Sequence, residues 1–312
     1  MLWPTPASAA PNKAGVAFDK TFSGHTLDQY ALRSVGAAWA YDYSSSVTTQ
    51  GDVEYVQLVW GRSPSSAPIA ANIATQRPGA TWLIGNEPDH PGQGNQPPAS
   101  YAAAYKAIYR AIKAADPTAK IYAGGISTVS PLRLAWLDAM LSAYGEPFEL
   151  DGWHIHPYIL PEACGWGVGL PVGIPPTVAQ GRGCEYGNRH GDPTALIEQV
   201  KLFRQWSIAK GLKRPLILSE FGILLTPAHG YDQAKIMAFM SKTVRWLNNC
   251  RYVSRYAWFS ANLTSMPGAL MDPATKQPNA LGLHYRRITG KERAKAAVDT
   301  GSKQVYLPLV GR

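Results

Sequence analysis

The sequence predicts a single-domain (β/α)8 TIM barrel with a long loop after the sixth strand. Eight short apolar or β-branched runs, each bounded by turn residues, recur along the chain. Segments with helical spacing lie between most of these runs. The length of 312 residues falls within the range of one such barrel. Alternation of strand and helix with eight repeats indicates this fold class.

The eight expected strands follow one another in chain order. They cover residues 14–18, 37–42, 54–60, 81–85, 120–123, 150–156, 215–219 and 255–260.

Three of the intervening helices can be placed from their patterns. One apolar stripe at helical spacing stops before Asp116-Pro117. Its members are Tyr101, Tyr105, Ile108 and Ile112. A second helix is expected over 195–210, before Gly211, and a third over 233–249, after the capping residue Asp232. We interpret these stripes as faces packed on the barrel.

The segment 157–193 is rich in Gly and Pro, has no clear period and exceeds the length of an ordinary connection. Such a loop at the carboxyl ends of the strands usually shapes a substrate cleft. For the whole chain we expect a disordered or processed segment over 1–12, the barrel over 13–290 and a tail over 291–312.

Composition excludes several classes of partner. Thirty Lys and Arg face 21 Asp and Glu, a net charge of +9, but the basic residues are scattered, so we expect no nucleic-acid partner. No apolar stretch is long enough to span a membrane. Dinucleotide and phosphate-binding motifs are absent from the sequence, and we expect a monomer without a cofactor.

The cysteines and the first residues of the chain indicate the cellular compartment in which the protein is expected. Cys164 and Cys184 lie in one Gly-rich loop and could pair, which would contribute about 3 kcal/mol. Cys250 would then stay unpaired. Residues 7–10 resemble the tail of an export cleavage site, which favours a secreted or cell-surface protein. Three reduced thiols in a cytosolic protein remain the alternative.

Two glutamates are the candidate catalytic residues. Glu87 and Glu220 each end a short apolar run, over 81–87 and 215–220, where a barrel strand exposes its side chains. Glycoside hydrolysis needs one carboxyl group to protonate the leaving oxygen and a second to attack the anomeric carbon or to activate water. The pair therefore indicates that chemistry.

The motif Asn86-Glu87-Pro88 after the fourth strand, with Glu220 after the seventh, resembles the large clan of retaining (β/α)8 glycoside hydrolases. The resemblance implies that Glu87 is the acid/base, that Asn86 holds the sugar 2-hydroxyl and that Glu220 is the nucleophile. Four further stretches are similar to the alkali-sensitive-linkage-type glycosyl hydrolase catalytic core group, which includes endo-β-1,3-glucanases. They are residues 39–43, 54–61, 85–89 and 255–259.

Alternation of side chains along the sixth strand predicts that His154, His156 and Tyr158 share one face. If that face points into the barrel mouth, His156 and Tyr158 can hydrogen-bond the nucleophile or sugar hydroxyls. A buried structural role for His154, or a zinc site on His154 and His156, stays open. We expect no metal, because no further Cys or His has supporting spacing.

Several aromatic side chains are candidate platforms for pyranose rings. The clan resemblance implies that role for Trp258, at the end of the last strand. Trp60, Tyr43 and Trp166 are further candidates, with core packing as the alternative for each.

The sequence thus predicts a retaining enzyme that cleaves internal bonds of a β-glucan, with β-1,3-glucan preferred on the group resemblance. Its partner would be a polysaccharide or oligosaccharide. The same mechanism on cellulose, mannan or xylan, and transglycosylation, stay open. So does a non-catalytic carbohydrate-binding wall protein, and so does a metal-dependent hydrolase that uses His154 and His156.

Overall fold

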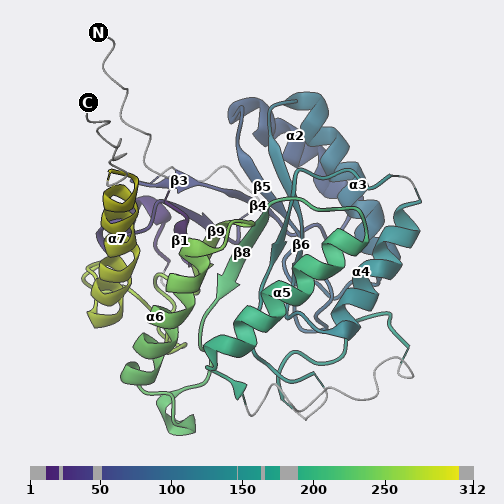
Figure 1. Cartoon of the computed structure of the whole chain (residues 1–312). Helices are drawn as coiled ribbons and strands as arrows, with labels where there is room; N and C mark the ends of the chain where they lie inside the picture. The colour runs from purple at the N-terminus through teal and green to yellow at the C-terminus, as the bar shows by residue number, and fades with distance from the viewer. Residues whose placement is uncertain are drawn as a thin grey trace, which may run out of the picture.

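The computed structural model describes residues 12–20, 24–44, 51–145, 147–162, 166–175 and 189–301. Within that part of the chain, nine short parallel strands form one sheet in the order β3-β2-β1-β9-β8-β7-β6-β5-β4. The strands lie at the centre of the molecule and the helices surround them (Figure 1).

The strands are close to those expected from the sequence. They are β1 (Ala14–Phe18), β2 (Trp39–Asp42), β3 (Glu54–Tyr55), β4 (Gln57–Val59), β5 (Thr81–Ile84), β6 (Lys120–Ile126), β7 (Gly152–Ile155), β8 (Leu216–Phe221) and β9 (Val253–Trp258).

The barrel closes through the expected strand 54–60, which is divided into β3 and β4 at Val56. β3 pairs with β2, whereas β4 pairs with β5. The backbone N–H of Val56 donates to the carbonyl of Ala40 at 2.8 Å. The two ends of the sheet are thus two halves of one chain segment, and the (β/α)8 prediction is confirmed.

Helices cover the outside of the strands (Figure 1). They are α2 (Ala67–Gln76), α3 (Pro98–Ala115), α4 (Pro131–Tyr144), α5 (Pro193–Ala209), α6 (Gln233–Asn249) and α7 (Ala280–Gly301). In the described part of the connection after β1 lie two short 3-10 helices, η1 (Leu27–Gln29) and η2 (Leu32–Val35). No helix in the described ranges is long and apolar enough to cross a membrane.

The expected helices are present with small shifts at their ends. The stripe from Tyr101 to Ile112 is the buried face of α3. The side chain of Asp232 caps α6 by accepting a hydrogen bond from the Lys235 N–H at 2.9 Å. α7 runs through residue 290, the expected end of the domain. Cys164 and Cys184, the disulfide candidates, lie outside the described residues; Cys250 is a free, buried thiol.

The interior of the barrel and the layer beneath the helices form two separate cores. Inside the strands lies a small cluster that includes Tyr41, Leu83, Ile217 and Ala257. Trp82 and Ile84, the neighbours of Leu83 on β5, belong to the larger cluster under the helices. Alternation along each strand therefore separates the two cores, as a barrel requires.

Two glycines bring the ends of β5 and β6 together. Gly85 and Gly124 have φ values of 107° and 118°, which favour glycine. A Cβ on Gly85 would lie 2.5 Å from the carbonyl oxygen of Gly124. Tyr101 of α3 reinforces this contact, because its hydroxyl donates to the Ile84 carbonyl at 2.6 Å and accepts from the Gly124 N–H at 2.9 Å.

We expect Tyr101→Phe to lower the free energy of unfolding by about 1 to 3 kcal/mol, because it leaves the buried Gly124 N–H without its hydroxyl acceptor and removes one of two polar contacts of the Ile84 carbonyl. Chemical denaturation measures this change. Tyr109→Phe, at a half-buried position of the same helix, is the matched control and should cost less. Equal losses in the two variants would contradict the assignment.

Candidate active site

A cavity of about 530 Å³ opens at the carboxyl ends of the strands. Its walls come from the segments that follow or end β1, β2, β4, β5, β7, β8 and β9. The lining residues are Asp19, Tyr43, Trp60, Asn86, Glu87, His90, Gln93, Tyr158, Leu160, Gly167, Val168, Glu220, Leu224, Phe259, Leu263 and Met266. This is the face on which barrel enzymes carry their active sites.

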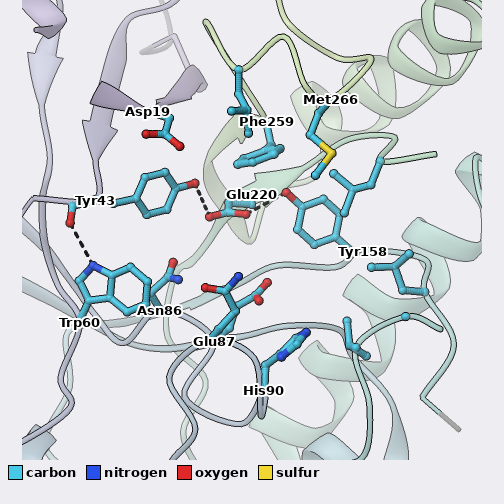
Figure 2. Close-up of a pocket in the computed structure, with 16 residues that line it drawn as sticks. Asp19, Tyr43, Trp60, Asn86, Glu87, His90, Tyr158, Glu220, Phe259 and Met266 are labelled. Carbon is cyan, nitrogen blue, oxygen red and sulfur yellow. Dashed lines mark hydrogen bonds between the residues drawn. The ribbon is translucent and has the colours of Figure 1, made fainter. Parts of the chain in front are cut away.

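Glu220 is held by three tyrosine hydroxyls. Its Oε1 accepts hydrogen bonds from Tyr41 at 2.9 Å and from Tyr43 at 2.7 Å. Its Oε2 accepts one from Tyr158 at 2.8 Å. Figure 2 shows Glu220 between the Tyr43 and Tyr158 rings. These donors fix the orientation of a carboxylate that is only 5% exposed and stabilise its negative charge.

A bulge in β8 directs Glu220 into the cavity. Leu218 and Phe221 both pair with β9, opposite Tyr256 and Trp258, so the register shifts between them. Three steps along β8 therefore match two along β9, which is the geometry of a β-bulge. Without the extra residue, alternation would place Glu220 with Leu218 under the helices.

Glu87 follows β5 with an unusual backbone. Its φ of 45° is in the left-handed region, which a residue other than glycine rarely adopts. Its N–H donates to the carbonyl of Gly125 at 2.8 Å. Its Oε1 lies 3.1 Å from His156 Nδ1. Strained backbone of this kind is typical of functional sites.

The two carboxyl groups face each other across a short gap. Glu87, His156 and Glu220 each place one polar atom within 4.8 Å of the other two. His156 Nδ1 lies 3.6 Å from Glu220 Oε2 in addition to its contact with Glu87. One histidine nitrogen therefore lies beside both glutamates.

The protonation of this cluster follows from burial and charge. Burial raises the pKa of Glu87; the hydrogen bond from His156 opposes this rise and the charge of Glu220 adds to it. Burial alone would lower the pKa of His156, but the charges of Glu220 and Glu87 outweigh it and the pKa is raised. Both pKa shifts are thus upward, and the charge of Glu220 contributes to each.

Asn86 and His154 differ in how their polar atoms are used. Asn86 Oδ1 is buried at the cavity and has no hydrogen-bond partner among the residues that the structure describes. Both ring nitrogens of His154 contact protein, Nδ1 at 2.9 Å from Ser219 Oγ and Nε2 at 3.2 Å from the Ile84 carbonyl. Burial lowers the pKa of His154 to about 3. Because both ring nitrogens of His154 already contact protein groups, a zinc site on His154 and His156 is disfavoured.

The aromatic residues predicted to be sugar platforms differ in their position relative to the cavity. Tyr43 and Trp60 line the cavity, and the Trp60 indole N–H donates to the Tyr43 carbonyl at 3.0 Å. Trp166 is 43% exposed next to the lining residue Gly167.

The prediction for Trp258 is wrong. Its indole is fully buried, packs on Phe221 and Tyr285, and donates to the Gly268 carbonyl at 2.7 Å. Strand alternation puts the next residue, Phe259, at the cavity instead.

Sequence reasoning missed several residues of the site. Tyr41 shares the parity of Trp39 and Tyr43 on β2, and this signal could have identified it. Asp19 and His90 line the cavity from loops, where no periodic pattern exists to indicate them.

The barrel and its facing carboxyl groups define a site of the glycoside hydrolase type. Residues 15–163 and 193–285 match the model of the family described as glycosyl hydrolase catalytic core. The chain belongs to this family. Among curated proteins, sequence comparison found no match.

Solved structures share the fold at low sequence identity. An endo-β-1,3-glucanase of GH128 subgroup I from Amycolatopsis mediterranei, in complex with laminaritriose, is 21% identical with a TM-score of 0.64, over 89% of this chain and 100% of that one. A subgroup II endo-β-1,3-glucanase from Pseudomonas viridiflava is 22% identical with a TM-score of 0.60, over 88% and 96%. A curdlan-specific exo-β-1,3-glucanase of subgroup III from Blastomyces gilchristii, in complex with glucose, is 18% identical with a TM-score of 0.60, over 89% and 99%.

We expect Glu87→Gln to raise the melting temperature at pH 7, although buried substitutions usually destabilise. The folded-state pKa of Glu87 lies above its unfolded value. Its contribution to stability is therefore complete below the unfolded pKa and is lost as the pH rises through the folded pKa. Glutamine does not ionise, so the variant keeps this stability at pH 7 and melts at a higher temperature. The difference in melting temperature should disappear near pH 4.

Thermal denaturation at the two pH values measures this effect. Glu198→Gln, on the surface beside Arg189, is the control and should change the melting temperature little at either pH. A lower melting temperature of Glu87→Gln at pH 7 would contradict the assignment.

Proposed function

We propose that this protein is a retaining glycoside hydrolase that cleaves internal bonds of β-1,3-glucan. The observation that carries the proposal is the pair of facing carboxyl groups, which place one oxygen each within 4.8 Å of the other and lie in different environments. Three tyrosine hydroxyls stabilise the charge of Glu220, whereas burial raises the pKa of Glu87. A nucleophile and an acid need that difference.

The separation supports a double displacement. Retaining enzymes hold their carboxyl groups about 5 to 5.5 Å apart, whereas inverting enzymes leave about 6.5 to 9.5 Å for a water molecule. In the first step a Glu220 oxygen attacks the anomeric carbon, the glycosidic C–O bond breaks, and the proton of Glu87 moves to the leaving oxygen. The product is a glycosyl ester on Glu220.

The second step reverses these roles. Forming the ester removes the charge of Glu220, which is one of the causes that raise the pKa of Glu87. The pKa of Glu87 therefore falls, and its carboxylate can take a proton from water. The water oxygen attacks the anomeric carbon, the ester bond breaks and Glu220 is released as a carboxylate.

The preference for β-1,3-glucan is supported by solved structures of the same fold that are named as β-1,3-glucanases, among them the Amycolatopsis mediterranei enzyme in complex with laminari-oligosaccharides. In the proposed complex Asn86, with its unpartnered buried Oδ1, binds the sugar 2-hydroxyl, and Trp60 and Tyr43 contact further sugar rings. The proposal includes a secreted or cell-surface enzyme that acts on a polymer outside the cell.

We expect short oligosaccharides from laminarin and none from carboxymethyl-cellulose, mannan or xylan. Product analysis by chromatography measures this, and NMR of the first product gives the anomeric configuration, which should be β. Glu220→Ala should lower turnover at least 10³-fold because it removes the attacking atom. A chelator should have no effect.

Other outcomes would replace parts of the proposal. Release from a different polymer would keep the mechanism and change the substrate. An α-configured first product would overturn double displacement, and longer products than the substrate would favour transglycosylation. Glycan binding without turnover in the unmodified protein would favour the binding-protein alternative. Inhibition by a chelator would favour a metal bound by Glu87, His156 and Glu220.

We expect His156→Gln to move the alkaline limb of the pH profile of kcat/KM to higher pH. The limb reports loss of the Glu87 proton, and His156 lowers the pKa of Glu87 through its hydrogen bond and charge. Glutamine carries no charge, so the electrostatic part of that effect is lost and the pKa of Glu87 rises.

His90→Gln is the matched control. The charge of His90 also lowers the pKa of Glu87 but contributes less. The alkaline limb of His90→Gln should therefore move to higher pH by a smaller amount. An alkaline limb that stays in place or moves to lower pH in His156→Gln would show that another group controls it.

A further inference from the structure

A buried ionic network lies behind the loop that carries Glu87. At its centre is Arg133 on α4, whose side chain is fully buried. Its Nη1 donates to Asp89 Oδ2 at 2.7 Å and to the Asp89 carbonyl at 3.1 Å. Its Nε donates to Glu162 Oε1 at 2.9 Å. Burying these charges costs free energy that ion pairing often does no more than offset, so stability alone does not account for the network.

Arg133 connects two walls of the cavity. Asp89 belongs to the loop after β5, whose residues Asn86, Glu87, His90 and Gln93 line the cavity. On the other side, Arg133 Nη2 donates to the carbonyls of Val168 and Gly169. Val168 also lines the cavity. One guanidinium therefore fixes the spacing between the acid/base loop and the loop after β7.

Asp89 is the point at which the network reaches Glu87. Its carboxylate also accepts hydrogen bonds from the Ser127 hydroxyl at 3.0 Å and from the Ser127 N–H at 3.2 Å. Its carbonyl accepts one from the Val172 N–H at 3.0 Å. Every one of these partners is outside the Glu87 loop, so the loop is held from β6, α4 and the loop after β7 at once.

The backbone of Glu87 requires such an anchor. Its left-handed φ of 45° costs free energy and persists only where the surroundings impose it. The peptide is tied at one end by the bond from the Glu87 N–H to Gly125. Pro88 restricts the torsions of the residue before it, and Asp89 fixes the chain two residues further on. Glu87 is thus held between two anchors.

We propose that Asp89, locked by Arg133 and Ser127, is a positioning residue that sets the Glu87 carboxyl group at the distance from Glu220 that proton transfer to the leaving group requires. This inference rests on the proposed function of Glu87. It assigns Asp89 no contact with substrate. Small displacements of a catalytic group can cost about 10²-fold in rate, so the effect is measurable.

The test compares two substrates that differ in their need for the acid. A laminari-oligosaccharide requires protonation of its leaving sugar, whereas a dinitrophenyl β-laminarioligoside has a leaving group that departs unprotonated. Asp89→Asn keeps the size of the side chain and removes its charge. We expect kcat/KM, which reports the first step, to fall about 10- to 100-fold on the oligosaccharide and less than about threefold on the activated substrate.

Glu162→Gln is the matched control, because it breaks the other half of the same buried network without touching the Glu87 loop. It should change kcat/KM by the same factor on both substrates. If Asp89→Asn also changes both substrates by one factor, in proportion to its loss of stability, the role of Asp89 is structural and the inference is overturned.

Two further measurements keep the inference testable. If Asp89→Asn does not fold, Ser127→Ala, which removes a single hydroxyl donor to Asp89, should show the same selective loss at a smaller size. A crystal structure of either variant needs no substrate: we expect the Glu87 carboxyl group to shift by about 1 Å, and an unmoved carboxyl group would contradict the proposal. Absence of turnover by the unmodified protein would instead refute the proposed function.

Discussion

The constraint on which the rest of the structure depends is the proximity of two buried carboxyl groups. Glu87 and Glu220 lie within 4.8 Å of each other at nearly inaccessible positions, where two negative charges repel and are poorly solvated. The protein resolves this by giving them different partners: three tyrosine hydroxyls for Glu220 and one histidine for Glu87. The strand ends, the aromatic side chains and the loop anchors all serve that arrangement.

The site is built by departures from regular structure. A bulge in β8 directs Glu220 toward the cavity. The left-handed backbone of Glu87 lies two residues after Gly85, where an added Cβ would collide with β6. Regular strands would have placed these side chains elsewhere, because alternation allows only every second residue to face the barrel. The free energy that these departures cost is balanced by the large apolar core beneath the helices.

The buried ionic network around Arg133 has a role other than stability. Arg133 has no contact with solvent and joins Asp89 to Glu162, and Glu162 Oε2 has no hydrogen-bond partner among the described residues. An apolar replacement of such a network is often as stable. A planar guanidinium with several donors can nevertheless hold two loops at a fixed spacing, which apolar contacts do less specifically.

The sequence by itself determined the strands, most helices and the two glutamates, because these depend on local patterns: runs of apolar residues, caps, and a carboxyl group at a strand end. Parity also placed His156 and Tyr158 on the face that contacts Glu87 and Glu220. Only the tertiary structure decided the closure through β3 and β4, the burial of Trp258 in place of Phe259, and the joining of Asp89, Arg133 and Glu162. A one-residue change of register reverses the side that a residue faces. The contacts of Arg133 with Glu162 and Asp89 join residues 29 and 44 positions apart, and contacts at such separations leave no periodic signal in the chain.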